Sequence, residues 1–276
     1  MAEAQKTTDL RLAVLGAGKM GSILLKAFLK SGLMTADHCT ATVAHAKNAE
    51  KAASNLGVPV TTDNLDAVRQ SDVVLLCVKP QAFADVLAKI SPALTADKLV
   101  ISVAASVPIS YMEERIPAGV PVIRSMPNTP AEVGAGITAI SPGAATTQAH
   151  VDLAEAMFAT VGKVVVADEK HMDAITGLSA SGPAFVYIIL ESLAEGGVKV
   201  GLPRDLATLL AAQTVMGSAK VVLDTGKHPA LLKDAVTTPA GCTVDGILEL
   251  EEGGLRVTLI KAVARAATRA KELLQS

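Results

Sequence analysis

A glycine-rich turn near the start of the chain constrains the fold more than any other feature. The apolar run Leu12–Leu15 has the length and composition of a buried strand, and it ends in Gly16-Ala-Gly-Lys-Met-Gly21. Apolar residues at helical spacing follow. A strand, a GxGxxG turn and a helix in this order predict a dinucleotide-binding unit. In such units Gly16 allows the tight turn, Gly18 lets a pyrophosphate approach the backbone, and Gly21 lets the helix pack on the strand. A glycine-rich turn that binds nothing is the alternative.

Strand and helix patterns alternate over the first 167 residues of the chain. After the first strand, we expect strands at residues 40–44, 58–60, 71–78, 99–103, 121–124, 136–140 and 163–166. Such alternation is typical of βαβ units, so we expect a Rossmann-type, doubly wound parallel sheet in residues 1–167. Strand patterns stop near Asp168. We therefore expect an all-α C-terminal domain in residues 168–276.

The C-terminal helices carry more apolar surface than they can bury among themselves. The clearest helix, residues 203–223, is apolar on more than one face and so must be surrounded. Roughly a hundred residues of helix form a small domain that buries only about 60% of its surface. We therefore expect a homodimer, with burial against the sheet domain as the alternative. The uncharged run at 174–190 is interrupted by Gly182-Pro183, and we interpret it as buried rather than membrane-spanning.

Composition excludes several classes of partner. The 25 basic and 27 acidic residues nearly balance, and the chain has no Trp and only two Tyr and four Phe. Neither a nucleic acid nor a membrane surface is therefore an expected partner. The cysteines Cys39, Cys77 and Cys242 are isolated and odd in number, which supports neither a disulfide framework nor a metal site. We expect a cytoplasmic protein without a metal.

The segment after the second predicted strand bears on the choice of cofactor. In NAD-binding folds an acidic residue usually ends this strand and binds the ribose hydroxyls. Here the chain reads His45-Ala-Lys-Asn48, and the first carboxylate is that of Glu50. Lys47 can pair with a 2′-phosphate and His45 can hydrogen-bond it, so the segment favours NADP(H), with NAD(H) as a second cofactor. A solvent-exposed Lys47 and a helix-capping Asn48 are the alternative.

Two later segments are too rich in glycine and hydroxyl groups for ordinary helix. One covers residues 176–185, and the other covers residues 236–243 and precedes a predicted helix that extends to Glu252. The second segment places hydroxyls and free backbone N–H groups at a helix N-terminus, where anions bind. Capped turns between helices are an equally good interpretation of the residues alone.

Taken together, segments along almost the whole chain resemble the pyrroline-5-carboxylate reductases. The matching segments are 16–21, 78–81, 102–105, 124–130, 173–185 and 236–243, of which the last two are specific to that family. The resemblance implies reduction of 1-pyrroline-5-carboxylate to L-proline by hydride transfer from NAD(P)H, the last step of proline biosynthesis. It also implies an N-terminal NAD(P)-binding domain, a helical dimerisation domain and a higher assembly, often a decamer of five dimers.

The resemblance also implies which residues form the sites. The pyrophosphate would be held by Leu15, Gly16, Ala17, Gly18, Lys19 and Met20, with Asn64 near the phosphates or the adenosine. The nicotinamide half would be lined by Cys77, Val78, Lys79, Pro80, Val103, Ala104 and Ala105. The substrate residues would be Glu169, Ala235, Thr238, Cys242 and Thr243. Backbone N–H groups at Cys242 and Thr243 would receive the substrate carboxylate, and Thr243 is the candidate catalytic hydroxyl for the imine nitrogen.

Two alternative functions stay open, and departures from the family pattern at Ala180 and Ala240 bear on one of them, a redox sensor. The family usually has glycine where Ser106, Ala180 and Ala240 stand, and Ala240 matters most if its backbone needs a positive φ. A redox sensor that binds NADPH without turnover is one alternative. A β-hydroxyacid dehydrogenase is the other, but such enzymes rely on a lysine in the first helix after the Rossmann domain. Residues 184–190 contain no lysine.

Overall fold

The chain folds into two compact units. The computed structural model describes residues 9–272. The first unit contains the residues up to Ala180 together with those from Ala266 onward, and the second unit is Ser181–Arg265. The last strand ends at Val166, next to the predicted domain boundary between residues 167 and 168, and the first unit also includes the helical segment that follows.

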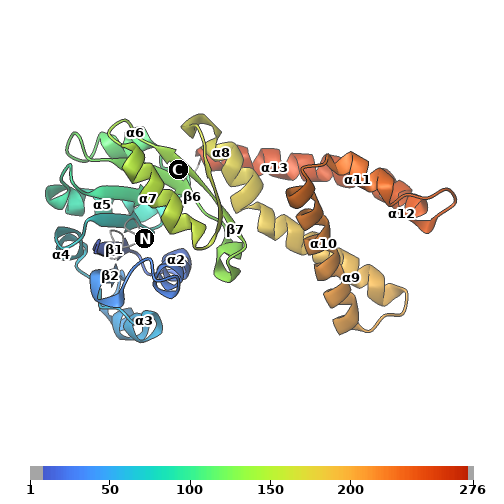
Figure 1. Cartoon of the computed structure of the whole chain (residues 1–276), viewed down its shortest axis with the longest axis horizontal. Coiled ribbons are helices and arrows are strands. Elements are labelled where there is room, and N and C mark those ends of the chain that lie inside the picture. Colours follow the sequence, from blue (N-terminus) through green and yellow to red (C-terminus); the bar gives the residue numbers. More distant parts are fainter. Residues whose placement is uncertain (1–8, 273–276) are drawn as a thin grey trace. The chain divides into compact units, whose positions relative to one another are not determined.

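The first unit is built on one eight-stranded sheet with the order β3-β2-β1-β4-β5-β6-β7-β8 (Figure 1). The strands are β1 (Leu12–Leu15), β2 (Cys39–Thr42), β3 (Val60–Thr61), β4 (Val73–Leu76), β5 (Leu99–Ser102), β6 (Val122–Met126), β7 (Gly136–Pro142) and β8 (Gly162–Val166). From β3 to β6 all neighbours pair in parallel, which confirms the expected Rossmann-type fold. Strand β7 departs from the expected parallel sheet because it pairs antiparallel to β6. The short link of residues 127–135 cannot make a parallel crossover, which needs a dozen or more residues.

Helices cover both faces of the sheet. They are α2 (Lys19–Lys30), α3 (Ala49–Leu56), α4 (Asn64–Arg69), α5 (Pro80–Ile90), α6 (Ile109–Glu113), α7 (Gln148–Ala159) and α8 (Met172–Ile175). One core cluster contains Val14 with Phe28 of α2 and Phe158 of α7. The other contains Leu15 and residues of α4, α5 and α6, including Phe83. Successive residues of β1 therefore face opposite cores, and this explains why the strand is apolar throughout.

The second unit is helical, as predicted. It contains α9 (Gly182–Lys199), α10 (Arg204–Thr225), α11 (Pro229–Ala235), α12 (Cys242–Glu252) and the first part of α13 (Leu255–Glu272). Helices α9 and α10 form a hairpin (Figure 1). The buried residues between them are Ala194, Ala207 and Ala211. Small side chains at these positions let the two helices approach closely, but they bury little apolar area.

Large apolar side chains on α9 and α10 are exposed in the single chain. They include Tyr187, Ile188 and Leu193 of α9 and Leu209, Leu210 and Met216 of α10. The prediction that residues 174–190 are buried is therefore wrong within one chain. Glu169–Lys199 and Arg204–Thr225 are long and apolar enough to cross a membrane, and 11% of each apolar window is buried. Exposed apolar surface of this extent marks a contact surface, and the predicted partner is a second copy.

We predict that Leu209→Glu breaks this self-association. Leu209 is 64% exposed in the single chain, and burying a leucine in an interface contributes about 1.5–3 kcal/mol. Loss of this burial and gain of a charge should raise the dimer dissociation constant at least about tenfold. Sedimentation velocity measures the change, with Gln213→Glu on the same helix as a control for the added charge. An unchanged sedimentation profile for Leu209→Glu would exclude α10 from the interface.

Candidate active site

The loops predicted to bind the cofactor meet at one edge of the sheet. Because β1, β4 and β5 are parallel, their carboxyl ends share an edge, where doubly wound proteins bind ligands. The backbone N–H of Cys77 donates to Leu15 (2.8 Å), and that of Val103 donates to Leu76 (3.0 Å). The structure thus brings together the segments that contain Leu15–Met20, Cys77–Pro80 and Val103–Ala105.

The glycine turn is tightly packed at Gly16 and Gly21 and open at Gly18. Gly16 has a φ of +98°, and a Cβ there would lie 2.9 Å from the carbonyl oxygen of Cys77. A Cβ on Gly21 would clash with the carbonyl oxygen of Gly16. Beside Gly18, in contrast, the described residues place nothing within 4 Å of such a Cβ. Helix α2 begins at Lys19, and its N-cap residue Gly18 contributes no capping side chain. Open space and free N–H groups at this helix N-terminus fit a bound phosphate.

A positively charged cleft adjoins the turn. It has a volume of about 740 Å³ and is lined by Gly18 and by Lys19, Lys26 and Lys30 of α2. Glu132 also lines the cleft, and Lys26 Nζ donates to Asn55 Oδ1 (2.7 Å). Three ammonium groups against one carboxylate attract anionic ligands to the cleft, which runs along the whole length of α2.

The residues predicted to distinguish NADP from NAD lie on the loop after β2. His45 precedes a single 3-10 turn, Ala46–Asn48, and His45 and Lys47 are both exposed. Asn48 occupies the N-cap position of α3, but its side chain makes no capping hydrogen bond. The structure therefore gives no support to the alternative that Asn48 serves as a helix cap. Asn64 is the first residue of α4, after β3.

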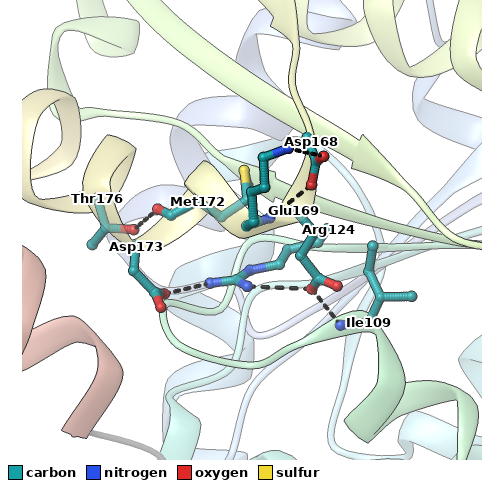
Figure 2. Close-up of polar contacts among 8 residues, drawn as sticks. Ile109, Arg124, Asp168, Glu169, Met172, Asp173 and Thr176 are labelled. Atoms are coloured by element: carbon teal, nitrogen blue, oxygen red, sulfur yellow. Dashed lines mark hydrogen bonds and ion pairs between the residues drawn. The ribbon is translucent and has the colours of Figure 1, made fainter.

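A buried arginine joins three parts of the first unit (Figure 2). Arg124 on β6 is 3% exposed. Its Nη1 donates to Glu169 Oε1 (3.2 Å) and its Nη2 donates to Asp173 Oδ1 (3.0 Å). The same Oε1 accepts the backbone N–H of Ile109, the first residue of α6, at 2.6 Å. We call Arg124, Glu169 and Asp173 the arginine clasp. Glu169, which the resemblance places at the substrate, thus has one carboxylate oxygen bound within the protein.

Asn128 makes a second connection to the same segment. Its Nδ2 donates to the carbonyl oxygen of Ser179 (3.1 Å), and its Oδ1 accepts the backbone N–H of Ile137 (3.0 Å). Ser179 belongs to a π-helical turn, Thr176–Ala180, and such turns are frequent at functional sites. The expectation that residues 176–185 are not ordinary helix is confirmed for residues 176–180 and is wrong for residues 182–185, which form the start of the α-helix α9. The sequence analysis named neither Arg124 nor Asn128 as a site residue. The signal for Arg124 is a lone charged residue inside an apolar strand.

The second segment rich in hydroxyl groups forms the turn before α12. Ala235 ends α11, Thr238 lies in the turn, and Cys242 and Thr243 begin α12. The N-cap residue Gly241 provides no capping side chain, so the N–H groups of Cys242 and Thr243 lack intrahelical partners. The structure thus gathers these four predicted substrate residues in one short segment of the second unit, whereas Glu169 belongs to the first unit.

Two of the three departures from glycine occupy backbone conformations that favour glycine. In the described part of the chain, Ser106 (φ +69°) and Ala240 (φ +58°) are the non-glycine residues with positive φ. Ala180 lies instead in the π-helical turn. A Cβ in the left-handed region costs roughly 1–2 kcal/mol. The turn before α12 forms with Ala240 in place, so the alanine strains this turn without preventing it.

Cys77 is not set up to act as a nucleophile. Desolvation raises the pKa of its thiol well above the usual range. Burial likewise raises the pKa of Cys39 to about 12. Both thiols are neutral at physiological pH, and Cys77 therefore offers a small apolar side chain to the cofactor loops.

We predict that Arg124→Met destabilises the first unit by about 3 kcal/mol. Methionine fills a similar volume but leaves Glu169 and Asp173, whose side chains are 32% and 24% exposed, without the guanidinium. Chemical denaturation measures the free energy of unfolding. Arg256→Met is the control, because its ion pair with Glu251 is exposed and contributes at most about 1 kcal/mol. Equal losses for both variants would contradict a structural role for the clasp.

Comparison with known proteins agrees with this geometry. Residues 169–273 match a family model described as pyrroline-5-carboxylate reductase dimerisation. Residues 11–106 match a model described as NADP oxidoreductase coenzyme F420-dependent. The crystal structure of a pyrroline carboxylate reductase from Plasmodium falciparum with NADP bound superimposes with a TM-score of 0.89 at 29% identity, and it covers 97% of this chain and 99% of its own.

Curated sequences extend the similarity over nearly the whole length. Pyrroline-5-carboxylate reductase from Methanosarcina acetivorans is 44% identical over 95% of this chain and 97% of its own length. The enzyme of the same name from Pisum sativum is 47% identical over 95% of each chain. The resemblance inferred from the sequence motifs is confirmed, and the chain belongs to the pyrroline-5-carboxylate reductase family.

Proposed function

We propose that this protein reduces the C=N bond of 1-pyrroline-5-carboxylate to give L-proline, with NADPH as the preferred cofactor. The near full-length identity to reductases of this name is the observation that carries the proposal. The glycine turn, the open N-terminus of α12 and the loops after β4 and β5 supply the elements that such a reaction needs.

In this proposal the sites are divided between the two units. The turn at Gly16–Gly21 and the N-terminus of α2 hold the pyrophosphate. The loops Cys77–Pro80 and Val103–Ala105 line the nicotinamide half, and Asn64 lies near the phosphates or the adenosine. The N–H groups of Cys242 and Thr243 receive the substrate carboxylate, and Ala235, Thr238 and Glu169 complete the substrate site.

The proposed reaction needs little general acid–base catalysis from the protein. A protonated cyclic imine is already electrophilic, and NADPH, when bound, supplies the hydride to its C=N carbon. The protein contributes position and electrostatics. The hydroxyl of Thr243 hydrogen-bonds the imine nitrogen and fixes the face of the ring, while the α12 N-terminus neutralises the carboxylate. Because the cofactor supplies the hydride and the protein supplies positioning and electrostatics, the site can operate without a His–carboxylate pair.

We predict that Thr243→Ala lowers kcat about tenfold or more, because a positioning or proton-transfer group is lost. Thr243→Ser keeps the hydroxyl and should retain most of the rate. NADPH oxidation in the presence of 1-pyrroline-5-carboxylate, with proline identified as the product, measures both variants. Wild-type rates in Thr243→Ala would remove this hydroxyl from the mechanism. NADPH binding without any turnover by the wild-type protein would instead favour the redox-sensor alternative.

Lys47 and His45 support the preference for NADPH. An exposed lysine after β2, where NAD-binding folds carry an acid, can pair with the 2′-phosphate. We predict that Lys47→Ala raises the KM for NADPH about five- to tenfold, the size of one lost charge-assisted contact, and leaves the KM for NADH unchanged. Lys51→Ala, an exposed lysine of α3, is the matched control. Equal effects on both cofactors would show that Lys47 does not recognise the 2′-phosphate.

The proposed assembly is supported by the same family membership. We propose a homodimer formed through the helical region matched by the dimerisation model, and five such dimers in a decamer. The exposed apolar side chains of α9 and α10 support the dimer. The three cysteines of the chain are all unpaired, and this supports a reducing cytoplasm as the location of the protein.

A further inference from the structure

The loop between β5 and α6, residues 103–108, has a conformation that costs free energy. Ser106 has a φ of +69°, which disfavours any residue with a side chain, and its buried Oγ makes no hydrogen bond within the described part of the chain. A strained backbone persists only where surrounding contacts determine it. The shape of this loop therefore depends on the contacts at its two ends.

The two ends of the loop are anchored in different ways. At the start, the N–H of Val103 donates to the carbonyl oxygen of Leu76 on β4 (3.0 Å), so this end is held by the sheet. At the far end, Pro108 is the N-cap residue of α6 and supplies no capping side chain. The N–H of Ile109, which has no intrahelical partner, donates instead to Glu169 Oε1, 60 positions further along the chain, at 2.6 Å (Figure 2). A hydrogen bond to a carboxylate is among the stronger ones, so Glu169 anchors the far end of the loop.

Glu169 is itself held in place by one of its two carboxylate oxygens. Arg124 donates to the same Oε1 (3.2 Å), and the second arm of its guanidinium donates to Asp173 Oδ1 (3.0 Å). The other oxygen, Oε2, makes no hydrogen bond to the described residues, and the side chain is 32% exposed. One oxygen thus holds the loop while the other stays open. Fixing the loop and contacting a substrate are therefore separable roles of this side chain.

We infer that Glu169 is a positioning residue for the cofactor: through the N–H of Ile109, it fixes the loop against which the nicotinamide ring lies. The inference rests on the proposed placement of the nicotinamide half at Val103–Ala105, whose first and last residues are partly exposed and can be reached by a ligand. A loop that is already fixed binds the ring without first losing conformational freedom. Loss of the anchor must therefore reduce the affinity for a cofactor that contains the nicotinamide, and spare a fragment that lacks it.

Paired substitutions separate this role from a general loss of stability. Glu169→Ala removes the acceptor, and Ile109→Pro removes the donor at the first position of a helix, where proline is tolerated. Asp173→Ala is the control for the first variant, because it removes the other ion pair of Arg124 and leaves the bond to Ile109 in place. Ile109→Ala is the control for the second, because it shortens the side chain and keeps the N–H. Glu169→Gln retains an oxygen that can accept this N–H.

Calorimetric titration of the full-length protein compares NADPH with 2′-phospho-ADP-ribose, a fragment that lacks the nicotinamide. We expect Glu169→Ala and Ile109→Pro to bind NADPH about 3- to 10-fold more weakly, the value of one hydrogen bond, and to bind the fragment with unchanged affinity. Glu169→Gln should recover most of the affinity for NADPH. The two controls should lower the Tm without changing the ratio of the two affinities. The double variant should lose no more than either single variant, because both remove the same hydrogen bond.

The outcomes distinguish this role from a failure of the proposed cofactor site. Equal weakening of NADPH and fragment by Glu169→Ala, or a selective loss of the same size in Asp173→Ala, would overturn the inference. Ala105→Leu adds bulk to the loop and should weaken NADPH more than the fragment. If Ala105→Leu has this effect and Glu169→Ala binds NADPH like the wild type, the role of Glu169 is overturned and the placement of the nicotinamide stands. If neither variant affects NADPH, the placement of the nicotinamide at this loop fails, and the inference fails with it.

Discussion

One buried guanidinium determines how the helical segment after the sheet is attached. Arg124 is buried in strand β6, where an unpaired charge would be very costly. Both of its carboxylate partners come from the segment 169–173, so that segment is fixed against β6. Asn128, just past the end of the same strand, fixes the π-helical turn at Ser179. Together these contacts fix the segment from Glu169 to Ser179 on the sheet of the first unit.

Two residues with a strained, left-handed backbone lie in loops that are predicted to bind ligands. Ser106 lies next to the predicted nicotinamide loop, and Ala240 lies in the predicted substrate turn. The turn that contains Ala240 is closed by the backbone N–H of Gly241, which donates to the carbonyl oxygen of Thr238 (3.0 Å). The Ser106 loop is bound at both ends, by the hydrogen bonds of the Ala104 and Ile109 N–H groups. Strain persists only where neighbouring contacts determine the conformation. Both strained residues therefore lie beside segments that we assign to ligand binding, and backbone strain is concentrated at such sites.

The sequence predicted local structure better than long-range contacts. Strand β1, the start of α2, and the end of α3 before Gly57 (φ +70°) follow from short-range rules of glycine and periodicity. The short helices α4 and α6 were not predicted, although Asp63 caps α4 by accepting the N–H of Asp66 (3.0 Å). The antiparallel β7 depends on the length of its link to β6. The clasp joins residues 45 and 49 positions apart, and such contacts leave no periodic signal.

The substrate turn presents a different problem, because its unit is poorly buried alone. The buried apolar cluster of Ser181–Arg265 contains only three alanines, and α12 has no buried residue. Burial of small side chains cannot offset the conformational entropy lost by ordering so many residues. The missing stabilisation must come from apolar surface such as Leu209 and Met216, which is exposed in the single chain and which we propose a second copy covers. Folding of the helical unit and association of two copies are therefore coupled, and the stability of the Thr243 segment depends on protein concentration.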